Sequence, residues 1–537
     1  MSKITKAFAT VSSLTILSRI LGFAREVLTA RFLGASAVAD AFFVALRLPN
    51  FLRQVFAEGA LSVAFVPMCS QMLADDKEKA KRFAEDTLSW LITILIPFCG
   101  LMMIFMPQII PIILPGETFA PGTVRYALTV EMARITYPFL LCISLVALMG
   151  GVLNSLHKFA PFAAAPCIFN IVITIFLLLG WAMPDVFASV GHAMAYGLTA
   201  SGIVQIIWMV WFLRRANFNL SLRLPRVTPE TKRLLMIMIP AAFAGSVTQI
   251  NLLLGQTIAS FLPGGSVSYL YYAERLNQLP IGILGVAAGT ALLPLLARAV
   301  KENNIIQAKH YLSRTIEFCL FLGLPTALAF LILAEPIQVT LFQRGEFTYE
   351  DARASARALM AMAIGIPAFV VAKSFVTVLF AHQDTKTALK VSLVVTISNI
   401  ALAFLLIWPL MPMGAGHVAI ALATSLAGWL NVWMLSFALR KRDLFALDDN
   451  CKRNVMQMLL AAGAMAIVLL LLLNITQDVF TGFNEFLRLA TLGGICAIGG
   501  AVYIGLCFKL GALKWDEVKS FLKPVKKDPD MQMAGTE

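Results

Sequence analysis

Charged residues are scarce in this sequence. Only 14% of its 537 residues are Asp, Glu, Lys or Arg, whereas charged residues make up about a quarter of a typical soluble domain. Hydrophobic residues make up 59% of the chain, and the mean hydropathy is +0.81. The composition excludes an ordinary soluble enzyme and predicts an integral membrane protein.

The sequence also lacks the motifs of common catalytic and metal sites. It has no P-loop, no HExxH or GxSxG motif, and no hydrophilic stretch long enough to form a nucleotide-binding domain. Its eight cysteines are scattered and include no CxxC pair, so we expect inert thiols in the core. We therefore expect no enzyme activity, no cofactor and no metal site, and any transport must run without an ATP-driven motor.

Long apolar segments fill most of the chain. About 20 apolar residues cross a hydrocarbon core of roughly 30 Å. Such segments must be helices, because lipid offers no partner to an unpaired backbone group. We predict an all-α polytopic membrane protein with 14 transmembrane helices, the second of them broken at Pro49. The predicted spans lie near residues 8–32, 37–73, 87–114, 128–153, 160–183, 188–213, 234–262, 268–297, 315–342, 358–381, 391–411, 414–438, 454–474 and 487–509.

The basic residues in the connections predict the orientation, because Lys and Arg near span ends stay on the cytoplasmic side. With the N-terminus inside, 30 of the 43 basic residues lie in cytoplasmic connections and 6 lie on the opposite side. We therefore place both termini in the cytoplasm. The net charge of +13 then reflects topology and contact with anionic lipid, and no nucleic acid is needed to explain it.

Two distant segments resemble each other. FLGASAVADAFFVALRL (32–48) aligns with FLPGGSVSYLYYAERL (261–276) at an offset of 228 residues, which places Arg47 opposite Arg275. Chance similarity of apolar helices is the alternative. Six spans in each repeat give both copies the same orientation, as in many transporters. We predict two parallel six-helix lobes, two extra C-terminal helices and a cytoplasmic tail, at residues 1–215 (TM1–TM6), 229–440 (TM7–TM12), 451–510 (TM13–TM14) and 511–537.

Several charged residues lie inside the predicted spans. An Arg or Lys at the bilayer centre costs about 2.5–3.5 kcal/mol, so these side chains must face a wet interior. The first two spans contain four arginines in a stretch of 35 residues, which is more than pairing with nearby acids requires. Such an excess of cations favours an anion, and the planar fork of arginine suits phosphate. The candidate binding residues are Arg19, Arg25, Arg47, Arg53, Arg275, Asn50 and Lys373.

The intramembrane acids have structural or gating interpretations. Glu131 and Arg134 are three residues apart, which predicts an ion pair on one helix turn. Adjacent helix residues point about 100° apart, so Glu274 and Arg275 do not pair readily. Asp40 either ends an outer loop or acts as the latch of a gate. The candidate charge partners are Glu26, Asp40, Glu58 and Glu274.

The residues of the first two spans resemble a known family. SRILGFAREVLTARFLG (18–34), ADAFFVALRLPNFLRQVFAEGALSVAFVP (39–67), YYAERL (271–276) and GVAAGTALLP (285–294) are similar to the signature of the MurJ (MviN) family. That family belongs to the multidrug/oligosaccharidyl-lipid/polysaccharide exporter superfamily, and its members are taken to flip lipid II across the bacterial inner membrane. The resemblance covers nearly the whole chain and implies the same fold, substrate and location.

The resemblance also implies roles for individual positions. The positions that match the family's essential cavity arginines are Arg19, Arg25, Arg53 and Arg275. Further positions implicated in activity match Asp40 and Lys373, and weaker matches are Asn50 and Glu58. This chain has Gln54 where some members have a second Arg, which weakens a paired-arginine role, and Glu26 where some have Asp, which keeps the charge. No sodium site is assigned.

The implied partners are membrane lipids and lipid II, an undecaprenyl-pyrophosphate-linked disaccharide-pentapeptide. Residues 451–510 would supply a groove for its polyprenyl tail, and contacts with the cell-wall synthesis machinery are left open. The alternatives are an exporter of another polyprenyl-linked saccharide and a cation-coupled drug exporter, whose cavity should favour acids and aromatics. A membrane glycosyltransferase or polymerase would need a catalytic site and an outer domain. A scaffold would leave the buried arginines unexplained.

Overall fold

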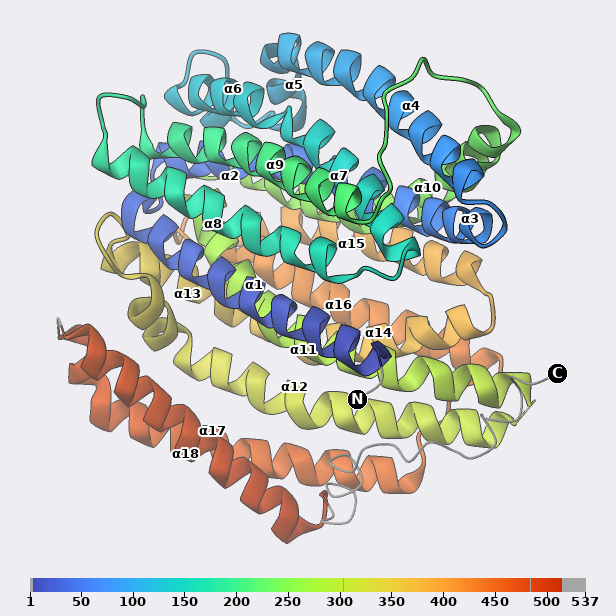
Figure 1. Ribbon diagram of the computed structural model, residues 1–537. Coiled ribbons are helices and arrows are strands. Elements are labelled where there is room, and N and C mark those ends of the chain that lie inside the picture. The colour runs from blue at the N-terminus through green and yellow to red at the C-terminus, as the bar shows by residue number, and fades with distance from the viewer. Residues whose placement is uncertain (1–2, 303, 483, 514–537) are drawn as a thin grey trace. The chain divides into compact units, whose positions relative to one another are not determined.

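The chain is helical throughout the part that the structure describes. This structure, a computed structural model, describes residues 3–302, 304–482 and 484–513 (Figure 1). Within these ranges it has 18 α-helices, one π-helix and one 3-10 helix, and no β-strand. The predicted all-α fold is confirmed. The predicted tail lies outside the described residues from residue 514 on.

The elements of the first half follow the first six predicted spans. Each span coincides with one helix or with a run of successive helices. The elements are α1 (Lys3–Leu33), α2 (Ala37–Leu52), η1 (Arg53–Leu61), α3 (Ser62–Asp75), α4 (Lys77–Ile104), α5 (Met106–Ile113), η2 (Glu117–Phe119), α6 (Val124–Thr136), α7 (Phe139–Ser155), α8 (Ala160–Ala182) and α9 (Val190–Arg215).

The second half continues in the same way over the remaining eight predicted spans. The elements are α10 (Pro229–Ala259), α11 (Ser266–Lys301), α12 (Ile305–Phe342), α13 (Tyr349–Ala363), α14 (Ile366–Ala381), α15 (Thr385–Leu410), α16 (Gly416–Lys441), α17 (Asp449–Thr481) and α18 (Glu485–Leu510).

Many of these helices are long and apolar enough to cross a membrane. Among the described residues there are nine such helices, with α6 and α7 counted together, or ten if the pair α13 and α14, bent by 43°, is one span. The other four predicted spans are helical along α1, along α2 to α3, along α10 and along α11. The count of 14 transmembrane helices stays a prediction.

The helices form two compact units. Unit 1 comprises Met1–Arg275, Leu341–Ala358 and Ser392–Ala427. Unit 2 comprises Leu276–Thr340, Leu359–Val391 and Gly428–Glu537. Unit 1 holds α1 to α10, the start of α11 and thus most of the charged candidates. The two six-helix lobes that the repeat predicts remain a prediction.

The second predicted span is distorted rather than broken at Pro49. The chain stays α-helical through Pro49 to Leu52 and then widens into the π-helix η1 before α3 begins at Ser62. Proline removes one backbone donor, which is the elementary cause of such distortions. π-Helical turns are frequent at functional sites, and this one begins at Arg53, a candidate residue.

Most cysteines are buried, and two asparagines inside helices, Asn170 and Asn399, form hydrogen bonds between helices. All eight cysteines are free, and all except Cys496 are buried, as expected. Asn170 on α8 donates to the Ser18 carbonyl of α1 at 3.0 Å. Asn399 on α15 donates to the Oδ1 of Asn251 on α10 at 3.0 Å. Each asparagine therefore ties its helix to a neighbouring one.

In unit 2, Asp448 begins α17 and anchors it to α12. Its Oδ1 accepts the N–H of Cys451 at 2.7 Å, and Nη2 of Arg314 lies 3.0 Å from its Oδ2. Arg314 also binds Glu317 at 2.6 Å. Partial burial raises the pKa of Asp448, but these hydrogen bonds outweigh it and hold the pKa below its ordinary value.

We expect Asp448→Ala to lower the free energy of unfolding by about 1 kcal/mol, the usual effect of losing an N-cap. Because the folded pKa is depressed, this contribution is present at pH 7 and is lost as the pH falls through that pKa. Thermal unfolding of the purified protein in detergent at pH 7 and at about pH 2, well below the ordinary Asp pKa of 3.8, measures both effects. Asp449→Ala is the matched control, since the Asp449 side chain is 97% exposed. Equal midpoints for the two variants at pH 7 would contradict the capping role.

Candidate functional site

Arg25 and Glu26 form the centre of the site on α1. Both residues are buried, and Nη2 of Arg25 lies 2.5 Å from Oε1 of Glu26. The guanidinium of Arg25 also lies over the ring of Phe169 on α8, at 5.4 Å from its centroid. A buried charge needs such partners to remain ionised, and this pair supplies them. Both side chains therefore point into protein.

The start of α11 contributes Tyr271 and Arg275 to the same cluster. The Tyr271 hydroxyl donates to Glu26 Oε1 at 3.0 Å, and Arg275 Nε lies 3.7 Å from the same oxygen. The Arg275 guanidinium lies 4.6 Å from the Tyr271 ring centroid, and that ring stacks on Phe43 of α2 at 3.8 Å. We call Arg25, Glu26, Tyr271 and Arg275 the arginine cluster. Its two arginines share one carboxylate, so it carries one excess positive charge.

Arg47 makes a second link between α2 and α11. Its Nη2 lies 2.7 Å from Oε2 of Glu274, and its Nη1 donates to the Leu252 carbonyl of α10 at 3.2 Å. Glu274 and Arg275 therefore contact different helices, although they are adjacent in the sequence. The Arg47 guanidinium is paired with Glu274 and its side chain is 22% exposed, whereas the Arg275 side chain is 40% exposed. Arg275 is therefore more accessible than Arg47 to a bound anion.

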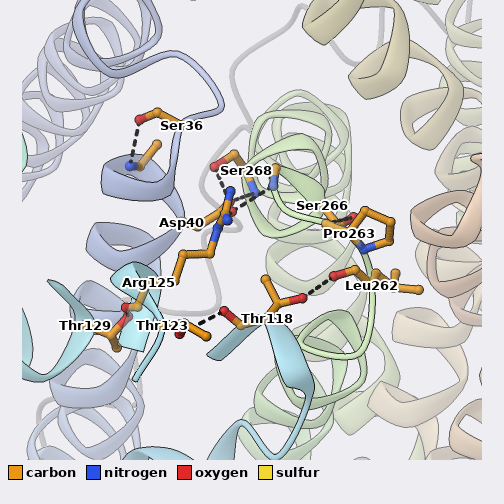
Figure 2. Close-up of polar contacts among 12 residues, drawn as sticks. Ser36, Asp40, Thr118, Thr123, Arg125, Thr129, Leu262, Pro263, Ser266 and Ser268 are labelled. Carbon is orange, nitrogen blue, oxygen red and sulfur yellow. Dashed lines mark hydrogen bonds and ion pairs between the residues drawn. The ribbon is translucent and has the colours of Figure 1, made fainter. Parts of the chain in front are cut away.

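Asp40 binds the N-terminus of α11 through several hydrogen bonds (Figure 2). Its Oδ1 accepts the N–H and the Oγ–H of Ser268 at 3.0 and 2.6 Å, and its Oδ2 accepts the N–H of Gly265 at 2.8 Å. Nε of Arg125 on α6 lies 3.0 Å from the same Oδ2. Asp40 thus caps α11 from another helix and holds α2, α6 and α11 together. We call Asp40, Arg125, Gly265 and Ser268 the latch, after the gating interpretation of Asp40, which stays a prediction.

A second set of contacts lies beside the latch. Thr118 donates through Oγ1 to the Leu262 carbonyl at 2.7 Å (Figure 2). The N–H of Gly116 donates to Oγ of Ser260 at 3.1 Å. The Arg125 guanidinium lies so close to Gly264 that a Cβ there would meet it at 2.1 Å. A side chain at position 264 would therefore force the Arg125 guanidinium to shift from its present place beside Asp40.

The other predicted residues have fewer or different contacts. Arg19 is exposed on α1 and has no ion-pair or hydrogen-bond partner within the described ranges. Arg53 donates through Nε to Oδ1 of Asn50 at 3.0 Å. Lys373 belongs to unit 2, where it is exposed and its Nζ contacts the Ile281 carbonyl at 3.4 Å. The side chain of Glu58 lies outside the described residues.

The predicted Glu131–Arg134 pair is wrong. Arg134 donates through Nε to the Met103 carbonyl of α4 at 2.9 Å, and Oε2 of Glu131 lies 3.1 Å from Nε2 of His192 on α9. Spacing along one helix gave the wrong pair because each side chain finds a partner on a neighbouring helix.

The comparisons with known proteins settle the family. A family model described as Lipid II flippase MurJ matches residues 29–491. The chain belongs to the MurJ family. A probable lipid II flippase MurJ of Rhizobium meliloti is 37% identical over 525 residues, covering 97% of this chain and 96% of the relative. A lipid II flippase MurJ of Burkholderia cenocepacia is 31% identical and covers 94% of this chain and 97% of its own.

Solved structures agree with this assignment. A lipid II flippase MurJ in an inward closed conformation matches with a TM-score of 0.75 and 27% identity, over 92% of this chain and 97% of that one. An inward-facing multidrug resistance MATE transporter matches with a TM-score of 0.67 at 15% identity, over 81% of this chain and 98% of its own, which shows the fold alone. The drug-exporter alternative is therefore not favoured over the MurJ assignment.

Three residues that contribute to the site of this MurJ family member were not among the predicted ones. Tyr271 lies four residues before Arg275 in the string YYAERL, and this spacing places both on one helix face, so the signal was present. Ser268 and Arg125 gave no such signal. Their roles depend on how the starts of α6 and α11 meet Asp40, which the sequence does not encode locally.

Proposed function

We propose that this protein flips lipid II from the cytoplasmic to the periplasmic leaflet of the bacterial inner membrane. The single observation that carries the proposal is the MurJ family match over most of the chain. The excess positive charge of the arginine cluster supports it, because the substrate's pyrophosphate is the anion that paired arginines suit.

The arginine cluster would bind the pyrophosphate by exchange of partners. In this structure the carboxylate of Glu26 is bound to both arginines. A pyrophosphate offers more acceptor oxygens than one carboxylate and would draw the guanidinium groups from Glu26. Tyr271 would then keep Glu26 hydrogen-bonded, so that its charge is not left without a partner.

Alternating access would carry the bound head group across the membrane. In this proposal the two predicted lobes rock, the latch closes the periplasmic side while the cytoplasmic side is open, and both termini stay in the cytoplasm. The polyprenyl tail would remain in lipid along the predicted groove of residues 451–510. Moving one net charge through the membrane field releases about 2.3 kcal/mol per 100 mV, so the membrane potential can drive the cycle.

The test is depletion of this protein in growing cells, followed by measurement of the lipid II that reacts with a probe added from the periplasmic side. We expect accessible lipid II to fall while total lipid II rises. Wild-type protein supplied in trans must restore both amounts. Normal accessibility with reduced polymerised glycan would overturn the proposal, since the protein would then act after translocation.

A further inference from the structure

An apolar groove runs between α4 and α10 in unit 1. Its cavity of about 300 Å³ is lined on α10 by Thr231, Leu235, Ile239 and Ala242, which share one helix face. The facing side of α4 contributes residues with the same spacing. They are Thr87, Trp90, Leu91, Ile94, Leu95 and Phe98.

The length of this groove along α10 matches the thickness of one leaflet of a bilayer. From Thr231 to Ala242 the helix rises about 16 Å at 1.5 Å per residue, close to one leaflet of a hydrocarbon core of roughly 30 Å. The groove is open to the outside of the protein, because Ile94, Leu235 and Ile239 are 51%, 48% and 56% exposed. Its walls are almost entirely hydrocarbon, so an aliphatic chain fits it and a polar ligand does not.

A basic strap lies at one end of the groove. The strap, residues 216–228, joins α9 to α10 without helical structure (Figure 1). It is fixed to α4: Ser221 donates through N–H and Oγ to Oε1 of Glu85, and Trp90 Nε1 donates to the Arg226 carbonyl at 2.9 Å. Arg223 Nε lies 2.8 Å from Oε2 of Glu85. Trp90 therefore belongs both to the groove wall and to the attachment of the strap.

The charges around this end favour an anion. Glu85 is buried and bound to Arg223, so it does not repel a ligand at the surface. Asp86 is also buried. Arg223 is exposed but bound to Glu85, and the other exposed basic residues of the strap and of the start of α10 are Arg226, Lys232 and Arg233. The partly exposed carboxylate of Glu230 offsets one of these three positive charges, so the accessible groups carry a net positive charge.

We propose that this groove binds one acyl chain of an anionic glycerophospholipid, whose phosphate contacts Arg226, Lys232 and Arg233. The groove supplies affinity for a chain one leaflet long, and the basic residues select the charged head group. Such residues near an anionic lipid surface each contribute roughly a fivefold gain in binding. The site lies on α4 and α10, away from the arginine cluster, and it does not depend on which substrate the protein carries.

Photo-crosslinking tests the proposal. The full chain is reconstituted in phosphatidylcholine nanodiscs that contain a trace of phosphatidylglycerol with a photoreactive group in one acyl chain. We expect labelled peptides from α4 and α10, with at least fivefold more label than from the same probe with a choline head group. The triple variant R226Q/K232Q/R233Q should remove this preference while the choline probe labels as before.

The matched control is K77Q/K79Q/R82Q, which removes three exposed basic residues at the start of α4. It should keep the preference for phosphatidylglycerol. A second variant, Ala242→Phe, fills the inner end of the groove and should reduce labelling there by either probe. Equal labelling by both probes in the wild type would overturn the proposal, as would displacement of the label by a polyprenyl phosphate but not by unlabelled phosphatidylglycerol.

Discussion

Asp40→Asn is expected to open the latch and to reduce lipid II flipping at least tenfold. The Asp40 side chain is 1% exposed and accepts hydrogen bonds from two backbone N–H groups, one hydroxyl and one guanidinium. An Asn side chain has one acceptor oxygen, so some of these donors lose their partner. Each unsatisfied buried donor costs about 1–3 kcal/mol, and 1.4 kcal/mol is a tenfold change in an equilibrium.

Labelling of an introduced cysteine measures the opening directly. Leu262 is 1% exposed and lies beside the latch, where its carbonyl accepts from Thr118. In a chain with Leu262→Cys, and with the exposed Cys496 replaced by Ser, a membrane-impermeant maleimide should react slowly. Adding Asp40→Asn should raise that rate about tenfold or more.

Two further variants test the hydrogen bonds of the latch and control for loss of a nearby charge. Ser268→Ala removes one donor to Asp40 and should have a smaller effect than Asp40→Asn. Glu117→Gln neutralises an exposed acid near Thr118 and is the matched control, with no change expected. An unchanged labelling rate in Asp40→Asn together with normal flipping would show that the latch does not control access.

The sequence was sufficient for the fold because its signals are local. A helix in lipid must satisfy its own backbone, so each apolar segment predicts one span without reference to any other. Arg25, Glu26 and Asp40 could be selected in the same way, since a charge inside such a segment must point into protein. The distortion near Pro49 also followed from one residue, although its form, a π-helix that begins at Arg53, did not.

The pairing of the charges could not be predicted, because it depends on contacts between helices. Glu131 and Arg134 have ideal spacing for a pair, yet each binds another helix. The sequence placed Arg125 only among the six basic residues on the outer side. Its ion pair with Asp40 forms between helices, where Gly264 leaves room for the guanidinium. The contact of Arg275 with Glu26 likewise depends on how α11 packs on α1.

The arginine cluster gives the second large prediction, in which neighbouring substitutions act in opposite directions. Arg25→Ala changes the cluster from an excess of one positive charge to neutrality. Charge-assisted hydrogen bonds contribute about 1.5–3 kcal/mol each, so the affinity for undecaprenyl pyrophosphate should fall about 10- to 100-fold and flipping should be lost. Glu26→Gln raises the excess to two positive charges. It should tighten binding yet slow turnover, because no carboxylate is left to displace the product.

Binding of undecaprenyl pyrophosphate to the purified variants, measured beside flipping, distinguishes these effects. Arg25→Lys keeps the charge without the planar fork and should lie between the wild type and Arg25→Ala. Arg134→Ala is the matched control, since this intramembrane arginine binds a carbonyl of α4 outside the cluster. If Glu26→Gln weakened binding as much as Arg25→Ala, the carboxylate would be needed to position the arginines, and the exchange of partners at Glu26 would be wrong.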